Sequence, residues 1–290
     1  MSSVPPEPGS AKPDPILVVD DLRRRFGGLV AVDVDHVEIQ RSSITALIGP
    51  NGAGKTTFFN LVTGFDEPDA GRWTFDGRPM QRLPPHRVAR GGMVRTFQLT
   101  KALARMSVMD NMKLGAPDQR GENFFRALVP SFWRAQEAEV EARAESLLER
   151  FRLTRLRDEY AGALSGGQRK LLEMARALMS DPTMVLLDEP MAGVNPALGE
   201  TLLAHIQSLR DLGKTVLFVE HDMDAVNEIS DWVVVMGEGR IIAEGPPEAI
   251  GNDHVVIDAY LGSHHDAPAT LEEEQRQLDE LTEATARESE

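Results

Sequence analysis

The sequence contains no cysteine in its 290 residues. A chain without thiols has no disulfide framework, no thiolate nucleophile and no cysteine-ligated metal site. Basic residues are also outnumbered, because 31 Lys and Arg stand against 46 Asp and Glu and leave a net charge of −15. A protein that binds duplex nucleic acid needs a basic face, so this balance argues against nucleic acid as a partner.

Long apolar runs are absent as well. The longest are short and rich in β-branched residues, at positions 44–48, 184–187, 216–219 and 232–236. A membrane-spanning helix needs roughly 18 or more apolar residues, whereas runs of this length are typical of buried strands. The N-terminus also lacks the basic and apolar segments of a secretory signal. We therefore expect any role at a membrane to come through partner proteins.

Composition divides the chain into three parts. Residues 1–15 carry five prolines and are expected to be a disordered leader. Residues 266–290 hold nine acidic and two basic residues, which supply −7 of the net charge. The segment 263–290 is therefore predicted to be an acidic tail, disordered or partly helical. The folded domain is expected between them, at 16–262.

Within that domain, short apolar strands alternate with amphipathic helices, which predicts an α/β fold with a parallel sheet. A helix is predicted at Pro196–Leu212, with Asn195 as its N-cap. The first 45 residues and the segment 72–78 have hairpin character and predict a small antiparallel flank. The region of about 100–168 is predicted to be a helical insertion. One of its helices has a single apolar stripe, formed by Val140, Ala144, Leu147, Leu148 and Phe151.

The segment Gly49–Thr56 reads GPNGAGKT and fits the pattern G-x-x-x-x-G-K-[ST] between a strand and a helix. Its glycines allow main-chain N–H groups to turn inward around phosphate oxygens, and the helix N-terminus adds a positive dipole end. Lys55 is predicted to reach the β- and γ-phosphates, and the Thr56 hydroxyl to bind Mg²⁺. The predicted binding residues here are Asn51, Gly52, Gly54, Lys55, Thr56 and Thr57.

Two further motifs belong to the same chemistry. The apolar strand at 183–187 ends in Asp188, predicted to bind Mg²⁺, and Glu189, predicted to act as a base or to orient the attacking water. The segment 164–168 reads LSGGQ and makes a second anion-binding helix terminus, unless it is simply a capped helix. One nucleotide rarely needs two phosphate cradles, so two chains arranged head to tail would use both. The predicted binding residues of this motif are Ser165, Gly166, Gly167 and Gln168.

The loop at 49–56, the LSGGQ at 164–168 and the Asp188-Glu189 strand end, in this order along the chain, resemble the nucleotide-binding subunit of an ABC transporter over about 16–262. The resemblance implies a P-loop NTPase fold, with a RecA-like parallel sheet core, an antiparallel β flank and an inserted α-helical subdomain. It also implies ATP and Mg²⁺ as cofactors and ATP hydrolysis to ADP and phosphate coupled to transport. The implied partners are transmembrane permease subunits and a second ATPase subunit, identical or different. The chain is then expected at the cytoplasmic face of the cell membrane, as a peripheral protein.

The resemblance assigns three more residues. Gln98 matches a glutamine that contacts Mg²⁺ and the attacking water, and His221 matches a switch histidine at the γ-phosphate. Phe26 stands where an aromatic ring stacks on adenine, although it could instead be a core residue. Asn195 stands where the broad family has an aspartate, and a role as a helix cap would by itself account for it. The catalytic set is thus Glu189, His221 and Gln98, and the metal set is Thr56, Gln98 and Asp188.

Five short segments resemble one branch, the ATPase subunits of branched-chain amino acid importers. They are FGGL at 26–29, TGF at 63–65, VRTFQ at 94–98, AGVNP at 192–196 and VEHDM at 219–223. That branch serves related small polar solutes too, with an extracytoplasmic solute-binding protein as an indirect partner. The alternatives are the ATPase of a lipopolysaccharide-type lipid exporter and a non-transport ABC ATPase. A small-molecule kinase or GTPase is disfavoured, because LSGGQ has no role in either and the Asn-Lys-x-Asp of GTPases is absent.

Overall fold

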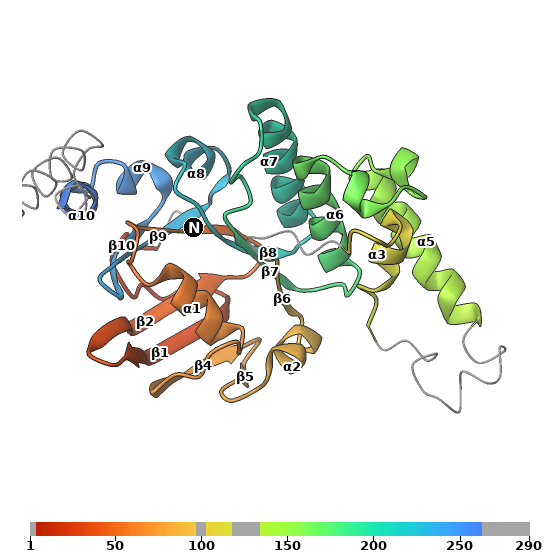
Figure 1. Cartoon of the computed structure of the whole chain (residues 1–290). Helices are drawn as coiled ribbons and strands as arrows, with labels where there is room; N and C mark the ends of the chain where they lie inside the picture. The colour runs from red at the N-terminus through yellow and green to blue at the C-terminus, as the bar shows by residue number, and fades with distance from the viewer. Residues whose placement is uncertain (1–3, 97–102, 118–133, 263–290) are drawn as a thin grey trace, which may run out of the picture.

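The computed structural model describes residues 4–96, 103–117 and 134–262, and a six-stranded sheet lies at its centre (Figure 1). The strand order is β10-β9-β3-β8-β7-β6, and all neighbours are parallel except β10, which runs antiparallel to β9. The strands are β3 (Ile44–Ile48), β6 (Met93–Arg95), β7 (Met184–Asp188), β8 (Thr215–Val219), β9 (Trp232–Gly237) and β10 (Arg240–Gly245). The apolar runs of the sequence are therefore strands of this sheet, as predicted.

Both faces of this sheet are covered, which explains why its strands are apolar throughout rather than alternating. The helices α6 (Gly166–Leu178), α7 (Pro196–Asp211) and α8 (Met223–Ile229) pack on one face (Figure 1). The helix α1 (Lys55–Val62) packs on the other. Successive residues of β3 belong to the cores on opposite faces of the sheet: Ala46 lies in the core under α6, and Leu47 lies in the core under α1.

The core that contains α1 is closed by a second, antiparallel sheet with the order β2-β1-β4-β5. Its strands are β1 (Pro15–Phe26), β2 (Leu29–Gln40), β4 (Ala70–Phe75) and β5 (Arg78–Pro79), and the short helix α2 (Pro85–Arg90) follows them. Trp73 and Phe75 of β4 are both 1% exposed and lie in this core. The predicted α/β fold with an antiparallel flank is confirmed.

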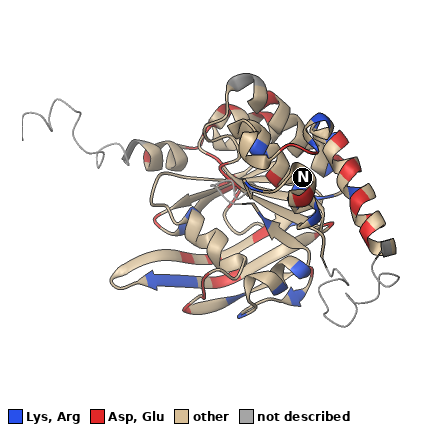
Figure 2. Cartoon of the chain, turned by 45° about the vertical axis from the view of Figure 1, so that its right-hand side comes forward, with Lys and Arg blue, Asp and Glu red and all other residues tan. Residues whose placement is uncertain are grey.

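The described parts of the predicted insertion, 103–117 and 134–168, are helical. They contain α3 (Val108–Lys113), α5 (Arg134–Arg150) and the 3₁₀ turns Thr154–Leu156 and Ala161–Ala163. All five residues of the predicted apolar stripe lie in the core or pack against it. Acidic residues occupy the other side of α5, four of them exposed (Figure 2). The stripe therefore attaches α5 to the core, and the polar face remains in solvent.

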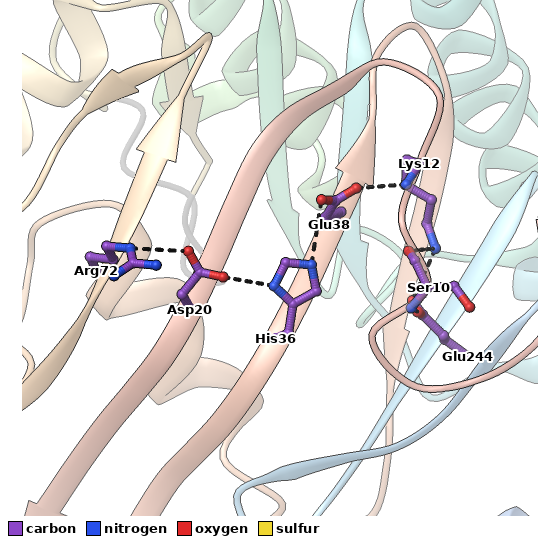
Figure 3. Close-up of polar contacts among 7 residues, drawn as sticks. All are labelled: Ser10, Lys12, Asp20, His36, Glu38, Arg72 and Glu244. Atoms are coloured by element: carbon purple, nitrogen blue, oxygen red, sulfur yellow. Dashed lines mark hydrogen bonds and ion pairs between the residues drawn. The ribbon is translucent and has the colours of Figure 1, made fainter.

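The leader differs from the expectation at 1–15, because the described residues 4–14 are anchored on the folded domain. Glu244, fully buried on β10, accepts hydrogen bonds from the Ser10 N–H at 2.6 Å and the Trp232 Nε1–H at 3.2 Å. It also pairs with the Lys12 ammonium at 3.3 Å (Figure 3). Burial lowers the pKa of Lys12, and the Glu244 carboxylate opposes that shift. Composition could not reveal this anchor, since Lys12 and Glu244 are 232 residues apart.

The described chain ends with α9 (Pro247–Ile250) and α10 (His254–Gly262). The predicted acidic tail, 263–290, lies outside the described residues. No helix among the residues that the structure describes is long and apolar enough to cross a membrane.

Candidate nucleotide-binding and catalytic site

The loop between β3 and α1 has a backbone that only glycine permits at two points. Gly49 has φ 145°, and a Cβ there would lie 2.1 Å from the Met236 carbonyl oxygen. Gly54, the N-cap of α1, has φ 98°, and a Cβ there would lie 2.2 Å from the Ala31 carbonyl oxygen. Neither contact tolerates a side chain. Strand β9 and strand β2 therefore fix this loop from two sides.

The polar residues of the loop remain accessible to a ligand. Asn51, Gly52 and Thr56 are exposed, and Thr57 is half-buried. The accessible Thr56 hydroxyl stands in the first turn of α1, at the positive end of the helix dipole. No acidic residue lies in that first turn, so the helix itself places no negative charge against a phosphate there.

Lys55 is folded into the loop. Its ammonium donates hydrogen bonds to the carbonyl oxygens of Gly49 at 2.6 Å and Pro50 at 2.9 Å. Burial lowers the pKa of Lys55, and the carboxylates of Glu189 and Asp188 oppose that shift. The structure thus brings together three predicted site residues, the lysine of the loop and the two acids at the end of β7.

Asp188 is held by a cation that the sequence did not reveal. Its Oδ2 lies 2.6 Å from Nη2 of Arg95, and both side chains are nearly buried. Nη1 of the same guanidinium donates to Oδ1 of Asn60 at 2.6 Å. Arg95 ends β6, the strand beside β7. A buried, charge-assisted pair of this kind fixes the position of the carboxylate and compensates its negative charge.

Glu189 stands in a strained turn directly after β7. Its φ is 46°, in the left-handed region that glutamate rarely adopts, and its N–H donates to the Val219 carbonyl at 3.0 Å. His221 lies past the end of the neighbouring strand β8, with its side chain 68% exposed. Both residues thus lie where ligands bind in open parallel sheets, at the carboxyl ends of the strands.

The LSGGQ segment is a capped helix N-terminus, as one interpretation had it. The Ser165 hydroxyl accepts from the Gln168 N–H at 3.2 Å, and the Gln168 side chain accepts from the Ser165 N–H at 2.9 Å. The two glycines differ. A Cβ on Gly167 would lie 1.6 Å from Leu198 of α7, whereas one on Gly166 would meet nothing within 4 Å. The fold therefore requires Gly167 but leaves Gly166 without a structural reason within the described chain.

The remaining predicted residues fall into three groups. The Phe26 ring is 47% exposed with the Arg24 guanidinium 4.8 Å from its centroid, so core packing is wrong and stacking on adenine stays a prediction. The Asn195 side chain accepts from the Leu198 N–H at 3.0 Å and caps α7, as predicted. Gln98 lies outside the described residues.

The donor set suits Mg²⁺ with phosphates rather than a metal cage. Within the described ranges, no group of three His, Asp or Glu side chains could hold a metal ion. Mg²⁺ commonly binds through one or two protein oxygens, substrate phosphates and water. The exposed Thr56 hydroxyl and the fixed Asp188 carboxylate match that chemistry.

Comparison with known proteins now adds to this geometry. The family model described as "ABC transporter" matches residues 32–192. A second model, "Branched-chain amino acid ATP-binding cassette transporter", matches residues 240–266.

Curated relatives match over nearly their whole length. A probable branched-chain amino acid transport ATP-binding protein LivG of Archaeoglobus fulgidus is 42% identical over 86% of this chain and 96% of its own. The high-affinity branched-chain amino acid transport ATP-binding protein BraF of Pseudomonas aeruginosa is 42% identical over 86% and 98%. LivG of Escherichia coli strain K12 is 41% identical over 86% and 98%.

Solved structures agree with the relatives. A nucleotide-free ATP-binding cassette from an ABC transporter has a TM-score of 0.74 and 36% identity, over 85% of this chain and 98% of that one. An ATP-binding cassette in its ADP conformation has the same TM-score and identity, over 86% and 99%. The phosphate loop, the strand-end acids and the LSGGQ helix are therefore parts of a known fold, and the chain belongs to the ABC transporter ATP-binding family, as an ATPase whose hydrolysis of ATP is coupled to transport.

Proposed function

We propose that this chain is the motor subunit of an importer for branched-chain amino acids or a related small polar solute. The observation that carries the proposal is the match at 240–266, because it lies outside the segment shared by ABC transporters in general. The relatives at 41–42% identity are named for branched-chain amino acid transport. These observations favour the importer over the lipid exporter and the non-transport ATPase.

In the proposed mechanism, Thr56, Asp188 and Gln98 would hold Mg²⁺. The bound ion would withdraw negative charge from the β- and γ-phosphate oxygens. The loop amides and Lys55 bind the phosphates, and Phe26 stacks on the adenine. Glu189 orients the attacking water and accepts its proton, since it follows β7 close to Lys55. His221 contacts the γ-phosphate from the end of β8.

We further propose that a second ATPase subunit, identical or different, completes the site head to tail. Gly166 supports this arrangement, because a Cβ there would have no atom of the described residues within 4 Å, so the described fold does not require a glycine at this position. A nucleotide held by the other subunit would use that space and the positive helix end at Ser165–Gln168. Each chain would then supply LSGGQ to its partner's nucleotide.

Gly166 and Gly167 give a matched pair of variants. Gly166→Val is expected to leave the melting temperature nearly unchanged but to lower hydrolysis by more than about tenfold, because it blocks closure on the partner's nucleotide. Gly167→Val is expected to destabilise the fold by about 2 kcal/mol or more through the collision with Leu198. Thermal unfolding and steady-state ATPase assays measure both. Full activity of Gly166→Val with every LSGGQ altered would contradict the shared site.

The permease is proposed to dock in a groove of about 440 Å³ between α2, β6, the end of α3 and α6. Its lining includes His86, Arg90, Leu114 and Arg176, and it reaches Thr96, two residues before the predicted Gln98. A partner seated there would sense changes at the Mg²⁺ site directly. A permease bound in this groove would hold the protein at the cytoplasmic face of the membrane.

Purification of the tagged chain from detergent-solubilised native membranes tests the proposal. We expect two polytopic permeases and a second ATPase, and deletion of the gene should abolish uptake of labelled leucine, isoleucine or valine. A plasmid copy should restore uptake, and a Glu189→Gln copy should not. Recovery of the chain alone, or with soluble nucleic-acid proteins, would favour a non-transport ATPase, and unchanged uptake would exclude these solutes.

A further inference from the structure

Lys170, on the helix that begins with LSGGQ, binds the main chain of the segment after β7. Its ammonium donates hydrogen bonds to three carbonyl oxygens, of Glu189 at 3.2 Å, Pro190 at 2.8 Å and Ala192 at 2.5 Å. An ammonium has three donors, so these three acceptors use them all. The segment 189–195, which joins β7 to α7 and is here called the acid loop, is therefore tied to α6 by one side chain.

Glu220 binds the main chain of the same loop from the other side. This residue is 1% exposed and follows β8. One carboxylate oxygen accepts from the Met191 N–H at 2.8 Å, and the other accepts from the His221 N–H at 3.2 Å. The loop thus meets a cation at its carbonyls and an anion at an amide, and the anion also holds the main chain of the predicted switch histidine.

Glu220 is buried and Lys170 is half-buried. Burial lowers the pKa of Lys170, with Glu220, Glu173 and Glu189 opposing the shift. Burial also raises the pKa of Glu220, opposed mainly by its two main-chain donors. Lys170 also lines a small cavity together with Glu189, predicted to be catalytic, and Asp188, predicted to bind Mg²⁺. Such charge-assisted bonds in a low-dielectric setting are strong and directional.

Glu189 needs this support, because its left-handed backbone persists only where surrounding contacts over-determine it. We infer that Lys170 and Glu220 are positioning residues that hold Glu189 in place and link it to the LSGGQ helix of its own chain. Lys170 lies five residues after Ser165, about 7.5 Å along the axis of α6. A shift of LSGGQ on binding the partner's nucleotide is thereby passed to Glu189 in cis. This inference rests on the proposed function.

The test is a comparison of Lys170→Met with Lys214→Met in the full complex purified from native membranes. Lys214 is a matched control, because its ammonium is also held by a partner, the Asp181 carboxylate at 2.8 Å, but stands just before β8, away from the acid loop. We expect Lys170→Met to lower kcat between about tenfold and hundredfold, with KM and ATP affinity within about twofold, as for a misplaced catalytic group. Lys214→Met should match wild type. Unchanged kcat, or a loss confined to KM, would overturn the inference.

Glu220→Gln tests the same statement from the other side, and it serves if Lys170→Met fails to fold. An amide keeps the size of the side chain but offers one acceptor oxygen in place of two. We expect the same pattern, a lower kcat with an unchanged KM. A wild-type kcat for Glu220→Gln would remove Glu220 from the link.

A direct measurement of loop order separates this inference from the proposed function. Because the chain has no cysteine, Val194→Cys can carry a single spin label on the acid loop of the full-length chain. We expect Lys170→Met to increase label mobility and Lys214→Met to leave it unchanged. Equal label mobility in both variants would show that Lys170 does not restrain the acid loop. An absence of ATPase in the wild-type complex would instead refute the proposed function and leave the mobility result standing.

Discussion

Glu189→Gln is expected to reduce ATP hydrolysis by about 10²-fold to 10⁴-fold while ATP binding is retained. The amide has nearly the same shape as the carboxylate, so the contacts of the backbone survive the change. These contacts are the hydrogen bond from the Glu189 N–H to the Val219 carbonyl and the hydrogen bond from the Lys170 ammonium to the Glu189 carbonyl. What is lost is the ability to accept a proton from the attacking water.

The measurement is single-turnover hydrolysis together with the dissociation constant for ATP. Glu200→Gln is the control, because Glu200 is an exposed glutamate on α7, eleven residues further along the chain. It should behave as wild type. Turnover near the wild-type rate in Glu189→Gln would mean that another group accepts the proton, and the strained turn at Glu189 would then need a different explanation.

The sequence predicted the features that depend on local patterns. Strand β3, the glycine loop and α1 are contiguous in the chain. The sequence pattern that identifies the glycine loop therefore also shows where the strand before it and the helix after it lie. Asp188 and Glu189 were found because an apolar strand rarely ends in two acids without a ligand or solvent to meet them. The apolar stripe of α5 was found because a helix repeats every 3.6 residues.

The residues that were missed depend on contacts between distant elements. Arg95 meets Asp188 across 93 residues, and Lys12 meets Glu244 across 232. No spacing rule reveals such pairs, because the sheet order decides which strands are neighbours. Glu220 is different: it directly follows the apolar strand β8, as Glu189 directly follows β7, so the same strand-end rule could have found it. The roles of the predicted site residues stay predictions until variants test them.

Lys55→Ala is expected to weaken ATP binding by about 10²-fold or more, because it removes the cation that is predicted to contact the β- and γ-phosphates. A comparison of ATP, ADP and AMP by calorimetry sharpens the test. If Lys55 contacts the terminal phosphates, affinity for ATP and ADP should fall while affinity for AMP stays nearly the same. Lys214→Ala, which removes a lysine paired with Asp181 far from the loop, should change none of the three.

The ammonium of Lys55 also binds the Gly49 and Pro50 carbonyls, so its loss could act by collapsing the loop instead. The two causes predict different results. A collapsed loop would weaken all three nucleotides alike and lower the melting temperature without nucleotide. Loss of a phosphate contact alone would spare AMP and leave that temperature close to wild type. Unaltered affinity for ATP would contradict the assignment of the loop, because a phosphate cradle that loses the Lys55 ammonium must bind a polyanion less tightly, whatever the amides contribute.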